Sequence, residues 1–250
     1  MPISVSHSTP HLYAVVDSDP RISRESLRWI DTGGPPVLLV GVVHDHPASE
    51  YRVSAIVEAI APETVALELP DLVVSAADGA HQSAAVGGEM AAAIAAAGAS
   101  SVVGIDVPGR RTGRAFVAEL RARRPALRTI LRTGRSIARM AAHAVASRLA
   151  QSGIPGESLI ATLDRGQEYD LPRDAPPSIQ ADHEVAHRRR STTLLRTFEP
   201  PPATSMLDAV RERYMAARLE SIREDGPVVA VVGCGHLDGI ETRLRKDRTD

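Results

Sequence analysis

Four polar side chains stand at the ends of four apolar runs, and their chemical types could hold a metal ion or move a proton. His44 ends the run GVVH and His236 ends the run GCGH, so both runs have the form G-x-x-H. Glu68 lies near the end of a third apolar run and Asp106 ends a fourth. Two imidazoles and a carboxylate can hold a divalent metal ion that activates water. Without a metal, the same groups could act as a general base and its orienting carboxylate.

The elements that must position these side chains are short strands separated by helices. The near-continuous apolarity of the runs favours strands that are covered on both faces. Because an alternation of strands and helices predicts parallel pairing, the carboxyl ends of the strands should meet at one edge, where ligands bind in open sheets. The predicted strands are Val37–Val43, Thr64–Leu69, Ser101–Asp106 and Val228–Val232, with helices over Ala48–Ala61 and Gly88–Ala97.

The middle of the chain, about residues 111–223, shows helical patterns and no convincing strand. The length of 250 residues favours one domain. We therefore predict a single α/β domain over residues 1–250, with a central sheet, mostly parallel or mixed, that is flanked by helices. The helical segment is predicted to be an insertion before the last strand. Its predicted helices are Pro125–Gln151, Gln180–Thr197 and Thr204–Ile222, and a last helix follows over Leu237–Arg245.

Composition and charge exclude several classes of protein. The single cysteine, Cys234, excludes an intramolecular disulfide framework and a four-cysteine metal site. The N-terminus has no secretory pattern and no run of about twenty apolar residues occurs, so we expect a cytoplasmic chain without a transmembrane segment. Between Arg110 and Arg139 there are ten arginines and one glutamate, but Phe116 is the one aromatic residue there. With little basis for base stacking, no nucleic-acid partner is expected.

Six segments of the chain carry a resemblance to a known family. In order they are VLLVGVVH, VALELP, GGEMAAAI, VVGID, RERYMAARL and VVAVVGCGHLDGI. This order resembles the TraB, or pheromone-shutdown, family, which is related to the Tiki metalloproteases and more distantly to erythromycin-esterase and ChaN-like folds. The resemblance implies a metal-dependent protease in which two G-x-x-H histidines and a glutamate function. It points to His44 and His236 as metal ligands and to Glu68 as ligand or base, with manganese, cobalt or zinc as the ion.

Arg211 and Glu89 are further candidates for the site. Arg211 shares an i, i+4, i+8 row with Leu207 and Met215 on an apolar face, so it should either pair with a carboxylate, such as Glu68 or Glu89, or extend to solvent at the helix edge. The family's R-[ND]-x-x-M segment falls on residues 211–215, with a glutamate at its second position here. A functional role for Glu89 depends mainly on the resemblance, because the helix dipole alone would favour an acidic residue in the first turn of a helix.

Three other histidines, in two parts of the chain, compete with this assignment. The segment HEVAH, with His183 and His187, matches the H-E-x-x-H pattern of zincins. Three arginines follow it, so a solvated charged helix is the preferred interpretation. His46 could add a ligand, although a histidine in a surface loop is the simpler interpretation.

These patterns predict a metal-dependent hydrolase of peptide or related acyl bonds. Arg211 would orient the substrate or stabilise an oxyanion, and Asp106 would be a supporting carboxylate. One alternative is a non-enzymatic regulatory protein that binds a peptide or small ligand in the same cleft, and another is a zincin-like site at HEVAH. The partner is expected to be a peptide or small molecule, and a homo-oligomer is left open.

Overall fold

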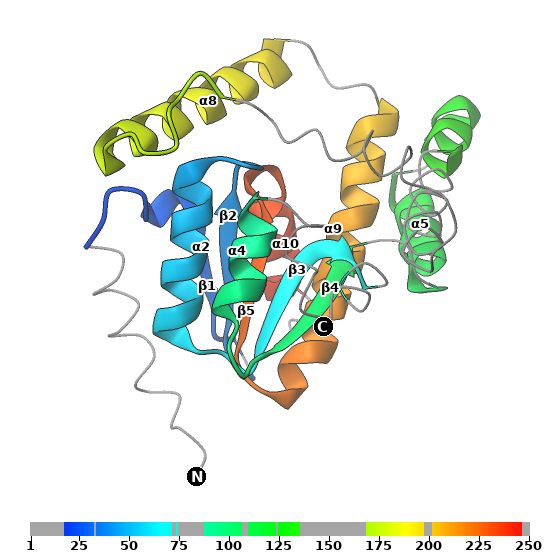
Figure 1. Ribbon diagram of the computed structural model, residues 1–250. Helices are drawn as coiled ribbons and strands as arrows, with labels where there is room; N and C mark the ends of the chain where they lie inside the picture. The colour runs from blue at the N-terminus through cyan, green and yellow to red at the C-terminus, as the bar shows by residue number, and fades with distance from the viewer. Residues whose placement is uncertain are drawn as a thin grey trace, which may run out of the picture.

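The centre of the protein is a five-stranded sheet with the strand order β1-β2-β5-β3-β4 (Figure 1). The computed structural model describes residues 18–32, 34–71, 74, 88–106, 110–123, 125–135, 169–197 and 202–246. The strands are β1 (Leu27–Ile30), β2 (Val37–Val42), β3 (Thr64–Pro70), β4 (Ser101–Asp106) and β5 (Val228–Gly233). Strands β2, β5, β3 and β4 run parallel, whereas β1 pairs antiparallel with β2. The predicted α/β class and all four predicted strands are confirmed.

Two features of the sheet were not predicted from the sequence. Strand β5 lies between β2 and β3, so these consecutive strands are not neighbours. The edge strand β1 was not predicted, because its four residues include Arg28 and show neither a continuous apolar run nor a clear alternation. The position of β5 matters for function, since it places the two G-x-x-H segments on adjacent strands.

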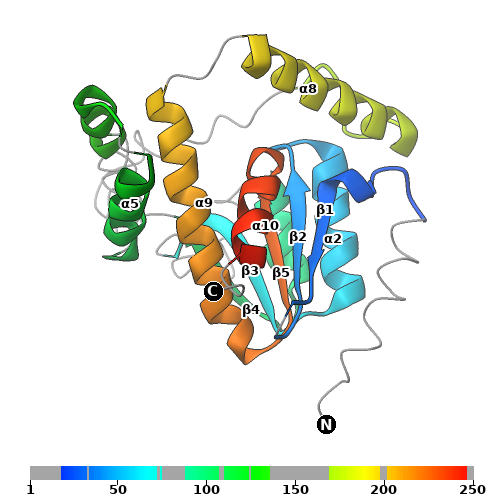
Figure 2. The same cartoon turned by 180° about the vertical axis from the view of Figure 1, so that it is seen from behind.

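Helices cover both faces of the sheet. Helices α2 (Pro47–Ile60) and α4 (Gly88–Ala96) pack on one face, and α9 (Pro202–Ile222) and α10 (Leu237–Lys246) pack on the other (Figures 1 and 2). Alternate residues of β2 face opposite layers: Leu38 contributes to the core under α2 and α4, and Leu39 to the core under α9 and α10. This two-sided burial explains why the strands read as continuous apolar runs.

The central part of the chain contributes helices with different positions. Helix α8 (Pro177–Thr197) lies across the end of the sheet where β2 finishes, and α5 (Arg110–Arg123) lies beside α9 (Figure 1). Helix α9 covers the sheet, so this end of the segment that we expected to be an insertion belongs to the main core. Of the predicted helix Pro125–Gln151, residues 127–135 are helical and residues 136–151 lie outside the described residues. Among the described helices, none combines the length and apolarity that a membrane crossing needs.

Candidate functional site

The two G-x-x-H segments leave the sheet side by side. In the parallel register, Gly41 of β2 lies opposite Val232 of β5, and Val42 lies opposite Gly233. A Cβ on Gly41 would stand 2.5 Å from Cδ1 of Leu237. The glycine of the β2 motif therefore allows the Leu237 side chain, at the start of α10 (Leu237–Lys246), to pack closely against β2.

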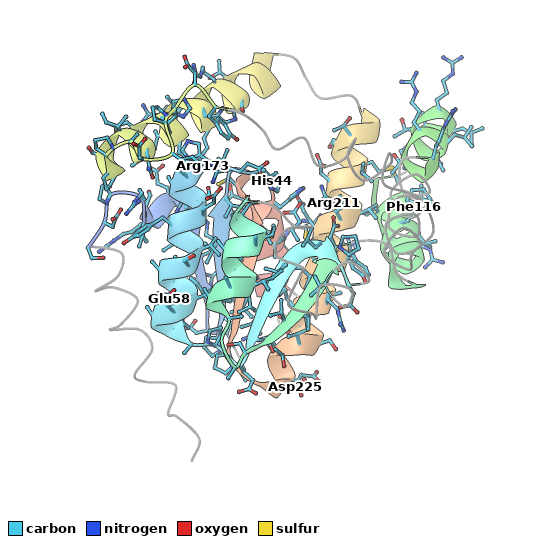
Figure 3. All side chains as sticks on the ribbon, viewed as in Figure 1. His44, Glu58, Phe116, Arg173, Arg211 and Asp225 are labelled. Carbon is cyan, nitrogen blue, oxygen red and sulfur yellow. The ribbon has the colours of Figure 1, made fainter. Side chains whose placement is uncertain are left out.

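A cleft of about 540 Å³ opens at this edge of the sheet. Its walls come from the ends of β2, β3 and β5, from the start of α10, and from α8 and α9. The predicted site residues His44, Glu68, Arg211 and His236 all line it. Figure 3 shows His44 at the end of β2, below α8, and Arg211 on α9. The structure thus brings together residues that are up to 192 positions apart in the chain, as His44 and His236 are.

His44 forms a histidine–carboxylate pair with Glu89. The distance between His44 Nδ1 and Glu89 Oε1 is 2.6 Å, and Glu89 is 2% exposed. Because an ionised carboxylate only accepts hydrogen bonds, Nδ1 carries the proton and the lone pair of the neutral ring lies on Nε2. The hydrogen bond to Glu89 raises the pKa of His44 above its ordinary value, against the effect of burial. The imidazole side chain is 59% exposed, so the ring remains open to the cleft.

The loop that carries His44 is held by two further hydrogen bonds. Asp45 has a positive φ of 57°, which is strained for a residue with a side chain. Its backbone N–H donates to Oε2 of Glu89 at 2.8 Å, and the Tyr169 hydroxyl donates to the carbonyl of His44 at 2.6 Å. Gly88 also has a positive φ, and a Cβ there would lie 2.5 Å from Oδ1 of Asp45. Glycine before Glu89 therefore allows α4 to approach the loop.

Arg211 is the centre of a second cluster. Its guanidinium donates to both oxygens of Asp106, at 3.2 and 2.8 Å, and to Oε1 of Glu68 at 2.5 Å. Burial alone would lower the pKa of Arg211, but the bonds to Asp106 and Glu68 raise it. The other carboxylate oxygen of Glu68 accepts from the backbone N–H of Gly233 at 2.6 Å. The expectation that Arg211 pairs with a carboxylate is confirmed for Glu68, whereas Glu89 pairs with His44.

His236 lies between Arg211 and a second glutamate. Its Nε2 is 3.1 Å from Nη1 of Arg211 and 3.5 Å from Oε1 of Glu68, while its Nδ1 is 3.4 Å from Oε1 of Glu212. A neutral ring accepts from Arg211 at Nε2, and a protonated ring donates to Glu68 there. Burial lowers the pKa of His236, but the bond to Glu212 and the charge of Glu68 outweigh it and raise the pKa. Arg243 holds Glu212 from the other side at 2.9 Å.

The two clusters meet at Gly233. A Cβ on this residue would stand 3.4 Å from Oε2 of Glu68, 3.9 Å from Nε2 of His44 and 3.9 Å from Cδ2 of His236. The ring nitrogen of His44 that carries the lone pair, the carboxylate of Glu68 and the ring of His236 therefore surround one small space. Glycine leaves this space free for a ligand or a water molecule.

The predicted metal ligands do not fit a metal ion in this arrangement. Both Oε1 of Glu68 and Nε2 of His236 contact the guanidinium of Arg211, so a divalent cation between them would face a positive charge. In the part of the chain that the structure describes, no group of three or more histidine, cysteine, aspartate or glutamate side chains is placed to hold a metal ion. Metal binding by His44, Glu68 and His236 stays a prediction that requires Arg211 to move away.

The HEVAH segment lies on α8 and is not the solvated charged helix that we expected. Glu184 is 2% exposed; it pairs with Arg52, which is fully buried, and accepts from Ser49. A buried glutamate bound in this way is not available as the general base that a zincin requires. The interpretation of His46 as a surface-loop residue is also wrong: His46 is fully buried, caps α2, and lies 3.1 Å from Nδ1 of His183.

Sequence reasoning missed two residues of the site, Glu212 and Tyr169. Glu212 follows Arg211 directly, and adjacent helix residues usually point in different directions, yet both contact His236 from opposite sides of its ring. Tyr169 supports the His44 loop from a segment that carries no pattern. The glutamate in the R-x-x-x-M segment was the one available signal for Glu212.

Comparison with protein-family models, with curated proteins and with solved structures finds no match for this chain. The TraB resemblance therefore stays a prediction, and the proposal for function depends on the geometry of the cleft.

Proposed function

We propose that the chain is a hydrolase of ester, peptide or related acyl bonds and that its reaction takes place in the cleft over Gly233. The observation that carries the proposal is the His44–Glu89 pair, whose second ring nitrogen lies near Gly233 together with Glu68 and His236. A histidine oriented by a buried carboxylate is the usual arrangement of a general base.

His44 is the base in this proposal. With the proton of Nδ1 directed to Glu89, Nε2 of the neutral ring can take a proton from a water molecule as that water attacks a carbonyl carbon. Glu89 then stabilises the imidazolium that forms, which agrees with the direction of the His44 pKa shift. The fixed loop around Asp45 keeps the ring in this orientation.

His236 is the acid. Its raised pKa favours a protonated ring, and Glu68 and Glu212 face its two nitrogens. The imidazolium can donate its Nε2 proton to a leaving oxygen or nitrogen that takes the place of Glu68 at this atom, and the neutral ring then accepts from Arg211 at Nε2. Proton movement at this residue thus exchanges one hydrogen-bond partner for another without a change in the fold.

Arg211 has a positioning role. Its positive charge is shared by two carboxylates, Glu68 and Asp106, so little of it remains to stabilise a developing oxyanion. The guanidinium instead fixes the carboxylate of Glu68 and the ring of His236. Of the two roles expected for Arg211 from the sequence, orienting or stabilising an oxyanion, this proposal keeps the orienting one.

The experiment that tests the proposal measures hydrolysis of a panel of 4-nitrophenyl esters and peptide 4-nitroanilides by the wild type and two histidine variants. His44→Gln should lower kcat/KM by about 10²- to 10⁴-fold, the range for loss of a general base. His183→Gln is the matched control on α8 and should leave kcat/KM unchanged. Activity should persist in the presence of a metal chelator.

Each other outcome contradicts a part of the proposal. Loss of activity on chelation, with recovery on addition of manganese, cobalt or zinc, would support the metal-dependent hydrolase and overturn the metal-free route. Loss of activity in His183→Gln, with His44→Gln intact, would select the HEVAH site. Retention of a ligand without turnover of any substrate would favour the non-enzymatic binding protein.

A further inference from the structure

Among the residues that the structure describes, three arginines line the cleft, and one of them differs from the others in its partners. Arg211 pairs with Glu68 and Asp106, and Arg28 pairs with Asp238 and Glu241. The third, Arg188, lies on α8 in the wall of the same cleft.

In the described part of the chain, the surroundings of Arg188 leave its charge without compensation. Among the described residues, its one hydrogen bond joins Nη1 to the hydroxyl of Ser26 at 3.1 Å, and no carboxylate pairs with it. Ser26 is fully buried, so the hydroxyl holds the guanidinium in place but supplies no charge. Glu25 also lines the cleft, but it is exposed, and no ion pair joins it to Arg188.

The helix geometry explains why this arginine reaches the cleft. Arg188 comes one turn after Glu184, and residues four apart share a helix face. Because Glu184 is anchored to Arg52 in the interior, Arg188 is directed toward the sheet. Its neighbours Arg189 and Arg190 are exposed, whereas Arg188 is half-buried. Cys234 of the GCGH turn lines the same cleft as Arg188.

We propose that Arg188 is the carboxylate-binding residue of the cleft and that the substrate carries a carboxylate in addition to the bond that is cleaved. The statement about a substrate rests on the proposed hydrolase, whereas the statement that Arg188 binds a carboxylate does not. A half-buried guanidinium with a neutral partner gains a charge-assisted hydrogen bond when a carboxylate arrives. Arg28 and Arg211 are already paired and gain less.

Binding is tested first, by calorimetry of the full chain with glutarate and with its neutral diamide, glutaramide. The wild type should bind glutarate at least 10-fold more tightly than glutaramide. Arg188→Gln should weaken glutarate binding by about 10- to 100-fold, the range for a hydrogen bond to a charged group. Arg189→Gln removes one exposed charge from the next position and serves as the control, and Arg188→Lys should restore part of the affinity.

Turnover is tested second, with 4-nitrophenyl acetate and the mono-4-nitrophenyl ester of glutarate. The wild type should favour the glutarate ester in kcat/KM, and Arg188→Gln should reduce that preference through KM. Equal binding of glutarate and glutaramide by the wild type would overturn the inference. This result involves no variant, so it does not depend on whether the variants fold. An equal loss in Arg189→Gln would overturn it too, and the hydrolase would still be judged on His44. Glutarate binding that depends on Arg188, without turnover of any ester, would support the carboxylate site and refute the proposed hydrolase.

Discussion

The buried ion pair between Arg52 and Glu184 joins α8 to α2 and therefore determines the wall of the cleft that α8 forms. Arg52 is fully buried. It donates to the carbonyl oxygens of Gly41 and Arg21 at 2.8 Å each, and it pairs with Glu184. The guanidinium thus has one charged partner and two neutral ones, so the loss of Glu184 would leave its charge uncompensated in the interior.

The perturbation is Glu184→Gln, which keeps the size of the side chain and removes its charge. Breaking a buried ion pair by the loss of one partner costs about 3–5 kcal/mol. Arg173→Gln is the matched control, because Arg173 lies just before α8 and forms an ion pair with Glu50 of α2. The Arg173 side chain is 71% exposed, and an exposed pair contributes about 0–1 kcal/mol.

Local opening of α8 is the expected response, because undocking this helix restores water to Arg52 without unfolding the sheet. Hydrogen exchange measured by mass spectrometry on peptides of α8 should therefore show protection reduced by about 100-fold or more in Glu184→Gln, which corresponds to about 3 kcal/mol. Peptides of β2 and β5 should keep their protection. Arg173→Gln should reduce the protection of α8 by about fivefold at most.

Two results would refute the reasoning. Equal protection of α8 in Glu184→Gln and Arg173→Gln would show that the buried pair does not hold the helix. A uniform loss of protection over β2, β5 and α8 would show that α8 does not open as a separate unit. The replacement of both partners, Arg52→Met with Glu184→Leu, should cost less than the two single changes together, because it leaves no buried charge.

Three further predictions concern single residues. In Glu89→Gln, an NMR titration of the His44 ring should show a lower pKa than in the wild type. Because the wild-type pKa of His44 is raised, the His44–Glu89 pair stabilises the fold at low pH. This stabilisation is lost as the pH rises through that pKa. Gly41→Ala should lower the free energy of unfolding by about 1–3 kcal/mol in urea titrations, because the added Cβ meets Leu237 at 2.5 Å. Burial lowers the pKa of His46 to about 4. As the pH falls, His46 is therefore protonated in the unfolded chain before it is protonated in the folded one. The free energy of unfolding should decrease by about 3 kcal/mol between pH 6.5 and 4. His46→Asn, which keeps an N-cap, should remove this pH dependence.

Much of the sheet was predictable because its strands are buried on both faces. Such strands must be apolar at every position, and the runs in β2 and β5 are visible for this reason. The polar residues that end these runs were predictable for the same reason, since His44 and His236 interrupt the apolarity. Strand β1 was not visible, because an edge strand of four residues with partial burial has no such requirement.

The partners of the site residues were not predictable from the residues alone. The sequence offered Arg211 two carboxylates, Glu68 and Glu89, and nothing in their spacing separates them. The three-dimensional arrangement decided the question, because β3 ends beside α9 whereas α4 starts beside the His44 loop. The order of the strands was not predictable from the residues alone either, because the insertion of β5 between β2 and β3 follows from packing across the whole sheet.

Burial of charge is the clearest case of what tertiary structure alone decides. By itself, the sequence determined an α/β chain with polar residues at the ends of apolar strands, because local apolarity and periodicity are properties of neighbouring residues. HEVAHRRR has the composition of a solvated helix, yet Glu184 is buried because Arg52, 132 positions earlier, meets it in the interior. The same docking directs Arg188 into the cleft. Charge compensation depends on pairs of residues distant in the chain, so only the folded protein determines which charges are buried, which are paired and which remain for a ligand.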